Sequence, residues 1–428
     1  LNYGINVIRV VVVAADGITT QAYTFRINNV DPSKQANDNN QSGGYDVPGL
    51  TVVIENGVAK VTVSDFVLDN AIAEAGRQKK EAIVISPVVT GSINKITFDL
   101  TGQAVLSIAN AGLALRLETP LFSLNLDLNA LMDIVRGGTN IISISIVEVN
   151  GQYSVIIKRD DEDLYNINGS ITAFIPVSDA GGGTVAVLTE VSSLAYNSVA
   201  LEGNLIMSPA KGLADKLDII KMSVYKEGKM IVPVTGTTTF KIVDNSKRFI
   251  DTRGYGTHID FVSARNLFYG TGPNTFSPDL SMNRSMVVAV LGRLGDIDAS
   301  GYNSSKFTDV ISSAYYAPYT EWAAQNGIVH GVGQNRFLPE QAITREQLAT
   351  IQFNYINFAD LKLDYINNDT SSFADDNEIS DYARNAIMTM KKAGIIYGKA
   401  DNRFDPKGTA TRAEVAAMLE RLAKNIKR

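Results

Sequence analysis

The sequence predicts a multidomain fold: an α+β or mostly β N-terminal module, followed by an all-α-rich region with pseudo-threefold symmetry. Two observations lead to this prediction. Residues 50–248 alternate short strand patterns with a few helical ones, and one motif recurs three times at fixed spacing within residues 249–428. The length of 428 residues agrees with two to four domains, at roughly 100–200 residues per domain.

The first 49 residues predict two strands and a linker. Strand patterns at 6–15 and 20–28 flank the turn dipeptide Asp16-Gly17. Two strands alone are marginally stable, so we expect residues 1–30 to be the terminal strands of a truncated β-sandwich-like module and the chain to be a fragment. Residues 31–49 are polar, contain glycine and show no periodicity, which predicts a flexible linker.

Residues 50–248 predict an α+β or β-rich module of unknown role. Hydrophobic alternation and the turn dipeptides 56–57 and 150–151 predict strands at 50–54, 58–63, 82–85, 96–100, 113–117, 121–126, 141–149 and 153–158. Helical periodicity with stop signals predicts helices at 64–80, 103–110 and 129–136. The remainder, to about residue 243, reads as β structure.

The acidic residues of this module have two interpretations each. The run 160–163 could bind calcium, but it lacks the alternating ligands and the glycine of an EF-hand loop, which favours a solvated hairpin tip. A glycosidase needs two carboxylates across a cleft. The candidates lie beside strands or turns, where a solvated role is favoured: Glu55, Glu118, Glu148 and Glu202.

Residues 249–428 contain the spacing Gly-x5-Phe-x-Pro-x5-Arg three times. Its members are Gly270, Phe276, Pro278 and Arg284; Gly331, Phe337, Pro339 and Arg345; Gly398, Phe404, Pro406 and Arg412. A Phe-x-Asp triplet opens each unit, at 249–251, 307–309 and 373–375. The pattern predicts three units, at about 249–306, 307–372 and 373–428. They should pack together, because one unit alone cannot bury its apolar helices.

Each motif arginine directly follows a residue that can cap the second helix of its unit, namely Asn283, Thr344 or Thr411. The last two also fit the capping box. A cation in this place is opposed by the helix dipole, so the arginine needs a purpose. Two compatible purposes remain open: a salt bridge, for instance with the aspartate of Phe-x-Asp, and an anion site made by the arginine and free helix N–H groups.

The three units resemble S-layer homology (SLH) repeats of bacterial surface proteins. The third unit carries the signature Thr-Arg-Ala-Glu at 411–414, within FADDNEISDYARNAIMTMKKAGIIYGKADNRFDPKGTATRAEVAAML. The resemblance implies an SLH trimer with one helix per repeat in a central bundle. It also implies grooves between repeats that bind secondary cell-wall polysaccharide, often pyruvylated and linked to peptidoglycan. Residues 1–30 resemble the end of a cadherin-like β-sandwich module.

The resemblance implies ten polysaccharide-binding residues. They are the motif arginines, the Phe-x-Asp aspartates, an aromatic sixteen residues before the fixed glycine, and a glycine four residues before it: Arg284, Arg345, Arg412, Asp251, Asp309, Asp375, Tyr315, Tyr382, Gly327 and Gly394. The first unit has Gly254 and Asn266 in the last two positions. We therefore expect its groove to be weakest, with Arg284→Ala harming binding less than the other two arginine variants. Those variants should weaken binding and change stability little.

The predicted function is non-covalent anchoring of a secreted protein to the bacterial cell wall or S-layer, through polysaccharide-binding SLH repeats. One alternative is the anchoring end of a surface polysaccharide hydrolase with its catalytic domain upstream. Another is a surface adhesin. Self-association in a surface layer is a further expectation. Trp322, the only tryptophan, has a predicted place in the helix core, with a sugar platform as the alternative.

The composition limits other functions. Lys and Arg number 39 against 45 Asp and Glu, a net charge of −6, so no nucleic-acid partner is expected. The absence of cysteine excludes disulfides and thiolate sites. Two histidines, His258 and His330, cannot form a metal cluster and are expected at the surface or in helix packing. We predict no metal, no cofactor, no catalytic residue and, as apolar runs fall short of ~20 residues, no membrane span.

Overall fold

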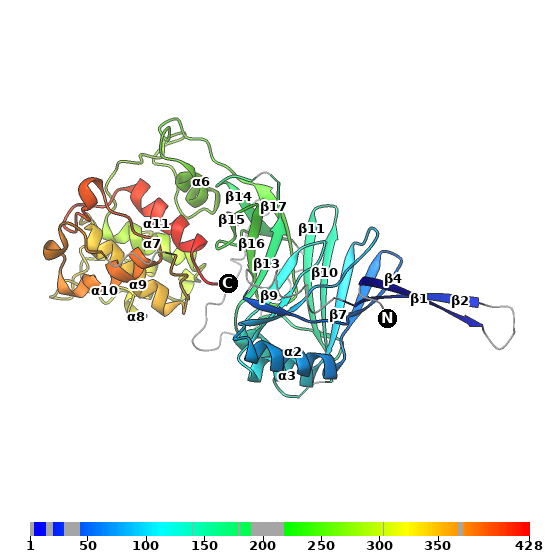
Figure 1. The fold of residues 1–428 in the computed structure, drawn as a ribbon. Helices are drawn as coiled ribbons and strands as arrows, with labels where there is room; N and C mark the ends of the chain where they lie inside the picture. Colours follow the sequence, from blue (N-terminus) through cyan, green and yellow to red (C-terminus); the bar gives the residue numbers. More distant parts are fainter. Residues whose placement is uncertain are drawn as a thin grey trace.

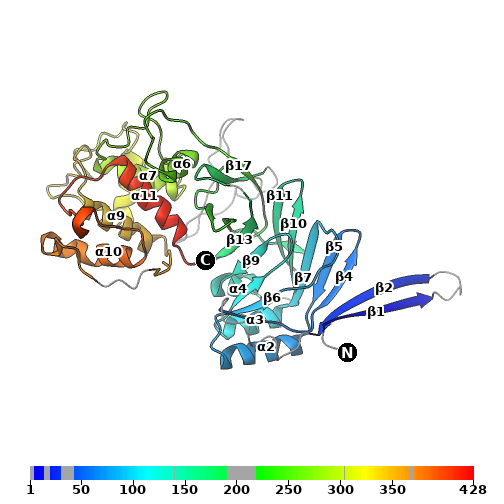
Figure 2. The same cartoon turned by 45° about the horizontal axis from the view of Figure 1, so that its top comes forward.

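A computed structural model describes residues 4–13, 20–29, 43–138, 140–178, 180–189, 218–302, 304–366 and 371–428. In these parts a β-rich N-terminal module lies beside a helical C-terminal region, and the C-terminus lies next to the module (Figure 1; Figure 2). The predicted succession of a β-rich part and a helical part is confirmed. Within the described residues, none of the helices is long and apolar enough to cross a membrane.

The larger sheet has the strand order β1-β2-β4-β5-β7-β10-β11-β17-β14, and β12 pairs with β11. Its strands are β1 (Gly4–Val13), β2 (Thr20–Asn29), β4 (Thr51–Glu55), β5 (Val58–Thr62), β7 (Lys95–Thr101), β10 (Ile141–Val149), β11 (Gln152–Arg159), β12 (Glu162–Asp163), β14 (Thr184–Leu188) and β17 (Thr238–Asp244). Only β5 and β7 run parallel. The β1–β2 hairpin extends away from the module and joins it through β4 (Figure 2).

The smaller sheet has the order β15-β16-β13-β9-β8-β6-β3. Its strands are β3 (Gly44–Asp46), β6 (Ala82–Ile85), β8 (Ala114–Leu117), β9 (Ser123–Leu126), β13 (Ile171–Pro176), β15 (Val224–Lys226) and β16 (Lys229–Val234). Strand β6, which lies between β8 and the edge strand β3, is buried at every residue, as expected for a strand covered on both faces. Strand β3 lies within the segment predicted as linker, because Tyr45 and the following residues 47 and 50 join the module core.

Three helices pack on the sheets: α2 (Asp65–Arg77), α3 (Gly102–Asn110) and α4 (Leu128–Ile134). Each begins where a side-chain oxygen accepts a backbone N–H, on Ser64, Thr101 and Asp127 respectively. Their apolar faces join one core with both sheets. The helices and strands predicted for residues 50–158 therefore occur within a few residues of the expected positions.

The acidic run 160–163 forms the tip of the β11–β12 hairpin. Asp160 and Asp161 have left-handed φ values of 47° and 71°, and the Asp160 carboxylate accepts the N–H groups of Asn140 and Ile141 at 3.0 and 2.9 Å. No cluster of three possible metal-ligating acids or histidines occurs in the part of the chain that the structure describes. Glu202 lies outside the described residues.

The C-terminal region contains six α-helices in its described residues: α6 (Thr257–Ala264), α7 (Arg284–Leu294), α8 (Ala317–Gln325), α9 (Arg345–Phe358), α10 (Asp381–Lys392) and α11 (Arg412–Lys424). Short 3₁₀ turns lie at Ala299–Gly301, Asp376–Glu378 and Ala400–Asn402. All six helices share one apolar core. Trp322 is 2% exposed within it, which confirms its predicted place in the helix core.

Each second helix packs on the first helix of another unit, in the pairs α7–α8, α9–α10 and α11–α6. The contact positions complement each other in size. Gly292 leaves room for the ring of Tyr319, which a Cβ at Gly292 would meet at 2.3 Å. At the equivalent place between α11 and α6, Glu420 forms a hydrogen bond with His258. His258 thus has the predicted helix-packing role.

The module and the helical region meet at α6 and the end of α11. Arg265, 1% exposed, donates hydrogen bonds to the carbonyls of Gly182, Thr184 and Ser223 at 2.6–3.0 Å. Near the C-terminus, Arg428 donates to Met222 O at 2.9 Å. Because the buried Arg265 and the partly buried Arg428 are bonded to carbonyls of the module, the joint is held by specific contacts that a flexible linker would not make.

Candidate functional site

The three units meet in a closed ring of backbone hydrogen bonds just before their second helices. Met282 N–H donates to Ala410 O, Ala410 N–H to Ile343 O, and Ile343 N–H to Met282 O, at 2.9–3.0 Å. Each unit therefore donates to one neighbour and accepts from the other. The ring brings the N-termini of α7, α9 and α11 together, and with them the three motif arginines.

The first N–H groups of these helices already have partners. Arg284 N–H donates to Gln341 O and Ser285 N–H to Pro339 O, each at 3.0 Å. The second-unit and third-unit helices make the same pair of bonds, Arg345 and Arg412 being the first donors. The next turn is closed by the predicted caps on Asn283, Thr344 and Thr411. The hypothesis of an anion site built from free helix N–H groups is therefore wrong.

The arginine side chains tie each unit to the Phe-x-Pro loop of another. The Nε groups of Arg284, Arg345 and Arg412 donate to the carbonyls of Phe337, Phe404 and Phe276 at 2.8, 2.7 and 2.9 Å. Each guanidinium also lies over the ring of the same phenylalanine, at 4.5–5.1 Å. With 6–8% of their surface exposed, the arginines serve first as ties within the fold.

A second bond from each arginine reaches the residue before the fixed glycine. Arg284 Nη2 donates to His330 O at 3.0 Å, Arg345 Nη2 to Tyr397 O at 3.5 Å, and Arg412 Nη2 to Tyr269 O at 2.7 Å. The side chains of His330, Tyr397 and Tyr269 are exposed. Sequence reasoning named His330 as a surface or helix-packing residue and did not name Tyr397 or Tyr269, although the constant place of all three before the glycine was visible.

The Phe-x-Asp aspartates hold the same loops from the other side. Each accepts two successive backbone N–H groups; for Asp375 they come from Phe404 and Asp405, both at 2.8 Å. Asp251 and Asp309 do the same in their units. These bonds, against burial, lower the pKa of all three carboxyls.

The residue between Phe and Pro adopts an unfavourable backbone conformation in this arrangement. Ser277, Leu338 and Asp405 take left-handed φ values of 55°, 57° and 58°, which side chains rarely adopt. Among the described residues, no motif arginine forms an ion pair with a Phe-x-Asp aspartate. The aspartate of Phe-x-Asp is therefore the wrong partner for a salt bridge, and the loop between the two groups links them. Arg345 does form a salt bridge, but with Glu414.

Gly327 and Gly394 lie at the ends of first helices, where they adopt φ values of 67° and 64°. The next residue donates its N–H back to the helix, as Ile328 does to Ala323 O at 2.8 Å, which is a Schellman-type ending. Asn266 has the same place in the first unit and a φ of 54°. The backbone of the first unit therefore differs little from that of the other two units at this position, because asparagine tolerates the left-handed region.

We call the place where a motif arginine meets the neighbouring loop a junction, named after its arginine. At the Arg412 junction, Tyr315 is 55% and Tyr269 56% exposed. Burial and the nearby charge of Glu340 raise the pKa of the Tyr315 phenol, while the charges of Arg293 and Arg412 oppose this rise. Arg293 lies over the Tyr269 ring, 4.9 Å from its centroid. No carboxylate lies within ion-pair distance of either arginine in the described chain.

At the Arg284 junction, Tyr382 is exposed but its hydroxyl donates to Glu346 at 3.0 Å. Burial, and after it this bond, raises the pKa of Tyr382 to about 12. Glu346 itself is buried and pairs with Lys407 at 2.6 Å. Burial opposes the change, but Lys407 and the neighbouring donors lower the pKa of Glu346. This junction carries its own anion.

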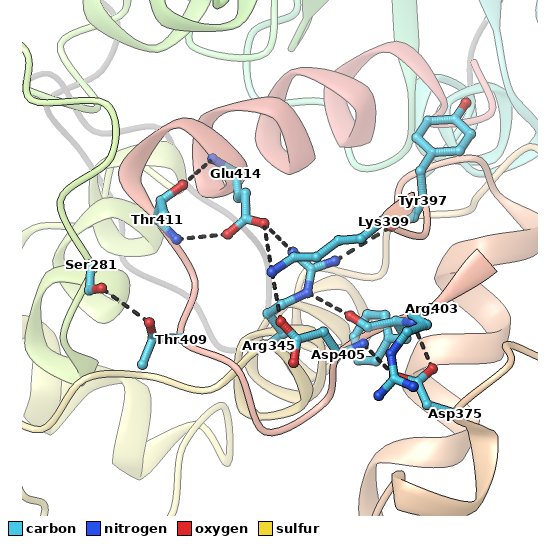
Figure 3. Close-up of polar contacts among 11 residues, drawn as sticks. Ser281, Arg345, Asp375, Tyr397, Lys399, Arg403, Asp405, Thr409, Thr411 and Glu414 are labelled. Carbon is cyan, nitrogen blue, oxygen red and sulfur yellow. Dashed lines mark hydrogen bonds and ion pairs between the residues drawn. The ribbon is translucent and has the colours of Figure 1, made fainter. Parts of the chain in front are cut away.

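At the Arg345 junction, the guanidinium already has a carboxylate partner (Figure 3). Arg345 Nη1 binds Glu414 Oε1 at 2.5 Å. Lys399 pairs with Asp405 at 2.7 Å and lies 3.8 Å from Glu414. Tyr397 is half exposed and stacks with Arg421, 4.5 Å from its ring centroid.

Comparisons with known proteins place similarity in this region. An S-layer homology domain model matches residues 306–349 and 372–416. Among similar proteins are an amylopullulanase of Thermoanaerobacterium thermosulfurigenes (36% identity over 162 residues) and the exoglucanase XynX of Acetivibrio thermocellus (35% over 162). A third is a cellulosome-anchoring protein of Acetivibrio thermocellus (26% over 172).

These alignments cover 38–39% of this chain but only 8%, 14% and 36% of the respective relatives. The chain thus spans a small part of the length of the proteins it matches. The two matched domains, and relatives that include a surface-layer protein of Lysinibacillus sphaericus, indicate an extracellular protein associated with the bacterial cell wall.

Proposed function

We propose that residues 249–428 form a trio of S-layer homology repeats that anchors the protein to the cell wall by binding secondary cell-wall polysaccharide. The closed hydrogen-bond ring carries this proposal. The family model matches the second and third units. The first unit makes the same ring, arginine and aspartate contacts as the matched ones. These equivalent contacts support a pseudo-threefold trimer with a divergent first repeat.

The ligand chemistry follows from the junctions. Residues 249–428 contain 19 Lys and Arg and 20 Asp and Glu, so no bulk positive field attracts an acidic polymer. Attraction has to come from guanidinium groups without counter-ions beside exposed aromatic rings, as at Arg412 and Tyr315. A planar guanidinium suits a carboxylate such as that of a pyruvyl ketal, and a tyrosine face suits a sugar ring.

The junctions rank differently from the sequence-based expectation. Residues of all three units meet at one junction, as Tyr382 and Glu346 do at Arg284. By the same arrangement, the position of Gly254 belongs to the Arg345 junction. We place the strongest site at Arg412 and the weakest at Arg345, so that Arg345→Ala harms binding least. Five of the predicted binding residues affect the ligand indirectly, because they fix the conformation of the Phe-x-Pro loops or of the helix ends: Asp251, Asp309, Asp375, Gly327 and Gly394.

The test is co-sedimentation of the full chain with purified wall sacculi before and after removal of the non-peptidoglycan polymers. Binding should be lost with the polymers, and free polymer should compete with the intact sacculi. Binding that survives their removal would assign recognition to peptidoglycan itself and contradict the proposal. The matched control is the full chain with Tyr165→Ala, an exposed tyrosine of the module, which should bind like the wild type.

A second candidate concerns the longer protein of which this chain would be part. Several relatives are named as glycan hydrolases, and others as an anchoring or surface-layer protein. We infer that the part of this chain similar to both groups serves anchoring, which does not depend on the catalytic activity named for the first group. The proposal that the longer protein is a hydrolase rests only on the names of the hydrolase relatives. Assaying that parent on polysaccharides separates it from an adhesin or a self-associating surface-layer protein.

A further inference from the structure

Arg293 occupies a position where a neutral side chain can make the same structural hydrogen bond. It lies nine residues after the motif arginine, on α7, and its Nη1 donates to Leu267 O at 2.9 Å. The equivalent residue of the second unit is Asn354, whose amide donates to Ile328 O at 3.1 Å. Since an asparagine makes the equivalent bond there, the guanidinium of Arg293 provides something beyond helix packing.

The surroundings of Arg293 indicate what that is. Its guanidinium stacks on the exposed Tyr269 ring at 4.9 Å and lies 6.0 Å from the Tyr319 ring. Tyr269 is also the residue whose carbonyl accepts from Arg412 at 2.7 Å. One tyrosine therefore bridges two cations, with its ring under one and its carbonyl bound to the other. Neither cation has a carboxylate partner within the described residues.

The other junctions lack this combination. In the second unit the position of Arg293 is occupied by the neutral Asn354, and the buried Glu346 at the Arg284 junction is paired with Lys407. In the third unit Arg421 stacks on Tyr397 in the same way, but Arg345 beside it is paired with Glu414. Two uncompensated guanidinium groups occur together only at the Arg412 junction of the described structure.

From this geometry we infer that Arg293 and Tyr269 form a second acidic-group subsite at the Arg412 junction, so that the junction selects a saccharide carrying two neighbouring carboxylates over one carrying a single carboxylate. Arg412 holds the first carboxylate and Arg293 the second, while Tyr315 and Tyr269 contact the sugar rings between them. Arg293 can donate two parallel bonds to a carboxylate through Nε and Nη2, because its bond to Leu267 O uses Nη1. Arg412 donates to its carboxylate through Nη1, because its Nε and Nη2 bind the carbonyls of Phe276 and Tyr269. The inference rests on the proposed polysaccharide binding and adds its charge requirement.

The experiment compares two synthetic disaccharides, bearing one or two pyruvyl ketal groups, in calorimetric titrations of the full chain. Wild type should bind the dianionic sugar about tenfold or more tightly, from one added charge-assisted interaction. Arg293→Asn copies the natural residue of the second unit, and should retain the wild-type melting temperature. It should bind both sugars alike. Unchanged preference in this variant would overturn the inference.

Two further variants separate charge from packing. Arg421→Asn makes the same change at the Arg345 junction and should leave the preference for the dianionic sugar intact. If Arg421→Asn abolishes this preference and Arg293→Asn does not, the second subsite lies at the Arg345 junction and the assignment is overturned. Arg293→Lys keeps a cation and should keep most of the preference, whereas a loss as complete as with asparagine would reduce the effect to stacking. If wild type binds neither sugar nor sacculi, the proposed function itself has failed.

Discussion

The Arg412 and Arg345 junctions share a framework and differ in the charges around it. In both, the guanidinium donates through Nε to a phenylalanine carbonyl of a neighbouring unit, at 2.9 and 2.7 Å. Arg345 is then neutralised by Glu414, while Arg412 has no carboxylate partner among the described residues. The repeated part of the motif therefore builds the fold, and the variable residues around it decide where an acidic ligand can bind.

The largest effect expected from this comparison is on stability. Arg412→Ala and Arg345→Ala each remove bonds to the carbonyls of a buried loop and leave those carbonyls without a partner. We expect each to lower the free energy of unfolding by about 3 kcal/mol, which replaces the sequence-based expectation of little change. Urea unfolding of the full chain measures it, with Arg293→Asn as the control of unchanged stability. Equal unfolding free energies for all three variants would contradict a stabilising role of Arg412 and Arg345.

Acid should weaken the framework through the aspartates. The pKa of Asp375 in the folded chain is lowered, so its contribution is present above the unfolded value of about 4 and is lost as pH falls through the folded value. Unfolding free energy should change little from pH 7 to 5 and fall below pH 4. Asp375→Asn should flatten that fall relative to the exposed Asp401→Asn. Parallel curves for the two variants would contradict this role.

The helix core beneath the junctions contains one polar exception. Gln352 is fully buried, and its amide has no hydrogen-bond partner among the residues that the structure describes, whereas the equivalent residues Leu291 and Leu419 are apolar. We expect Gln352→Leu to raise the free energy of unfolding by about 1–2 kcal/mol, because an unpaired buried amide is removed. Leu419→Gln should do the reverse. A destabilised Gln352→Leu variant would mean that the amide is paired in solution.

The smallest expected effect sharpens the comparison at the level of sugar contacts. Tyr315→Ala should weaken binding to wall polysaccharide by about 1 kcal/mol, a typical aromatic contribution. Tyr382→Ala should cost less, because its hydroxyl is bound to Glu346, whose charge disfavours an acidic polymer. Titration of both variants with one purified polymer measures the order. A larger loss for Tyr382→Ala would reverse the ranking of these two junctions.

The sequence predicted most of the repeat framework. The fixed motif spacing located the second helices, and the capping boxes at Thr344 and Thr411 occur as expected. Such local signals are readable because a cap and its partner lie three residues apart. The hydrophobic periodicity of the sequence likewise predicted α2, α3 and the strands of the module to within a few residues of their observed bounds.

The junctions could not be predicted, because they depend on which units meet. Arg412 contacts Tyr269, 143 residues away, and spacing within one unit gives no sign of this partner. The sequence-based ranking grouped Arg284 with Gly254 of its own unit, whereas in the structure Tyr382 of the third unit lies near Arg284. The role of Asp375 was also hidden, since its partners are two N–H groups of a left-handed turn. What was visible and overlooked is the exposed residue before each fixed glycine.

The most direct test is to observe the arginine side chains while wall polymer binds. In an NMR titration of the full chain, the side-chain Nε–H resonances of Arg412 and Arg293 should shift most on adding a polymer fragment. That of Arg345, already paired with Glu414, should shift least. Arg265, buried in the joint with the module, is the internal control. Binding that shifts Arg345 most, or leaves all repeat arginines unchanged, would contradict the account.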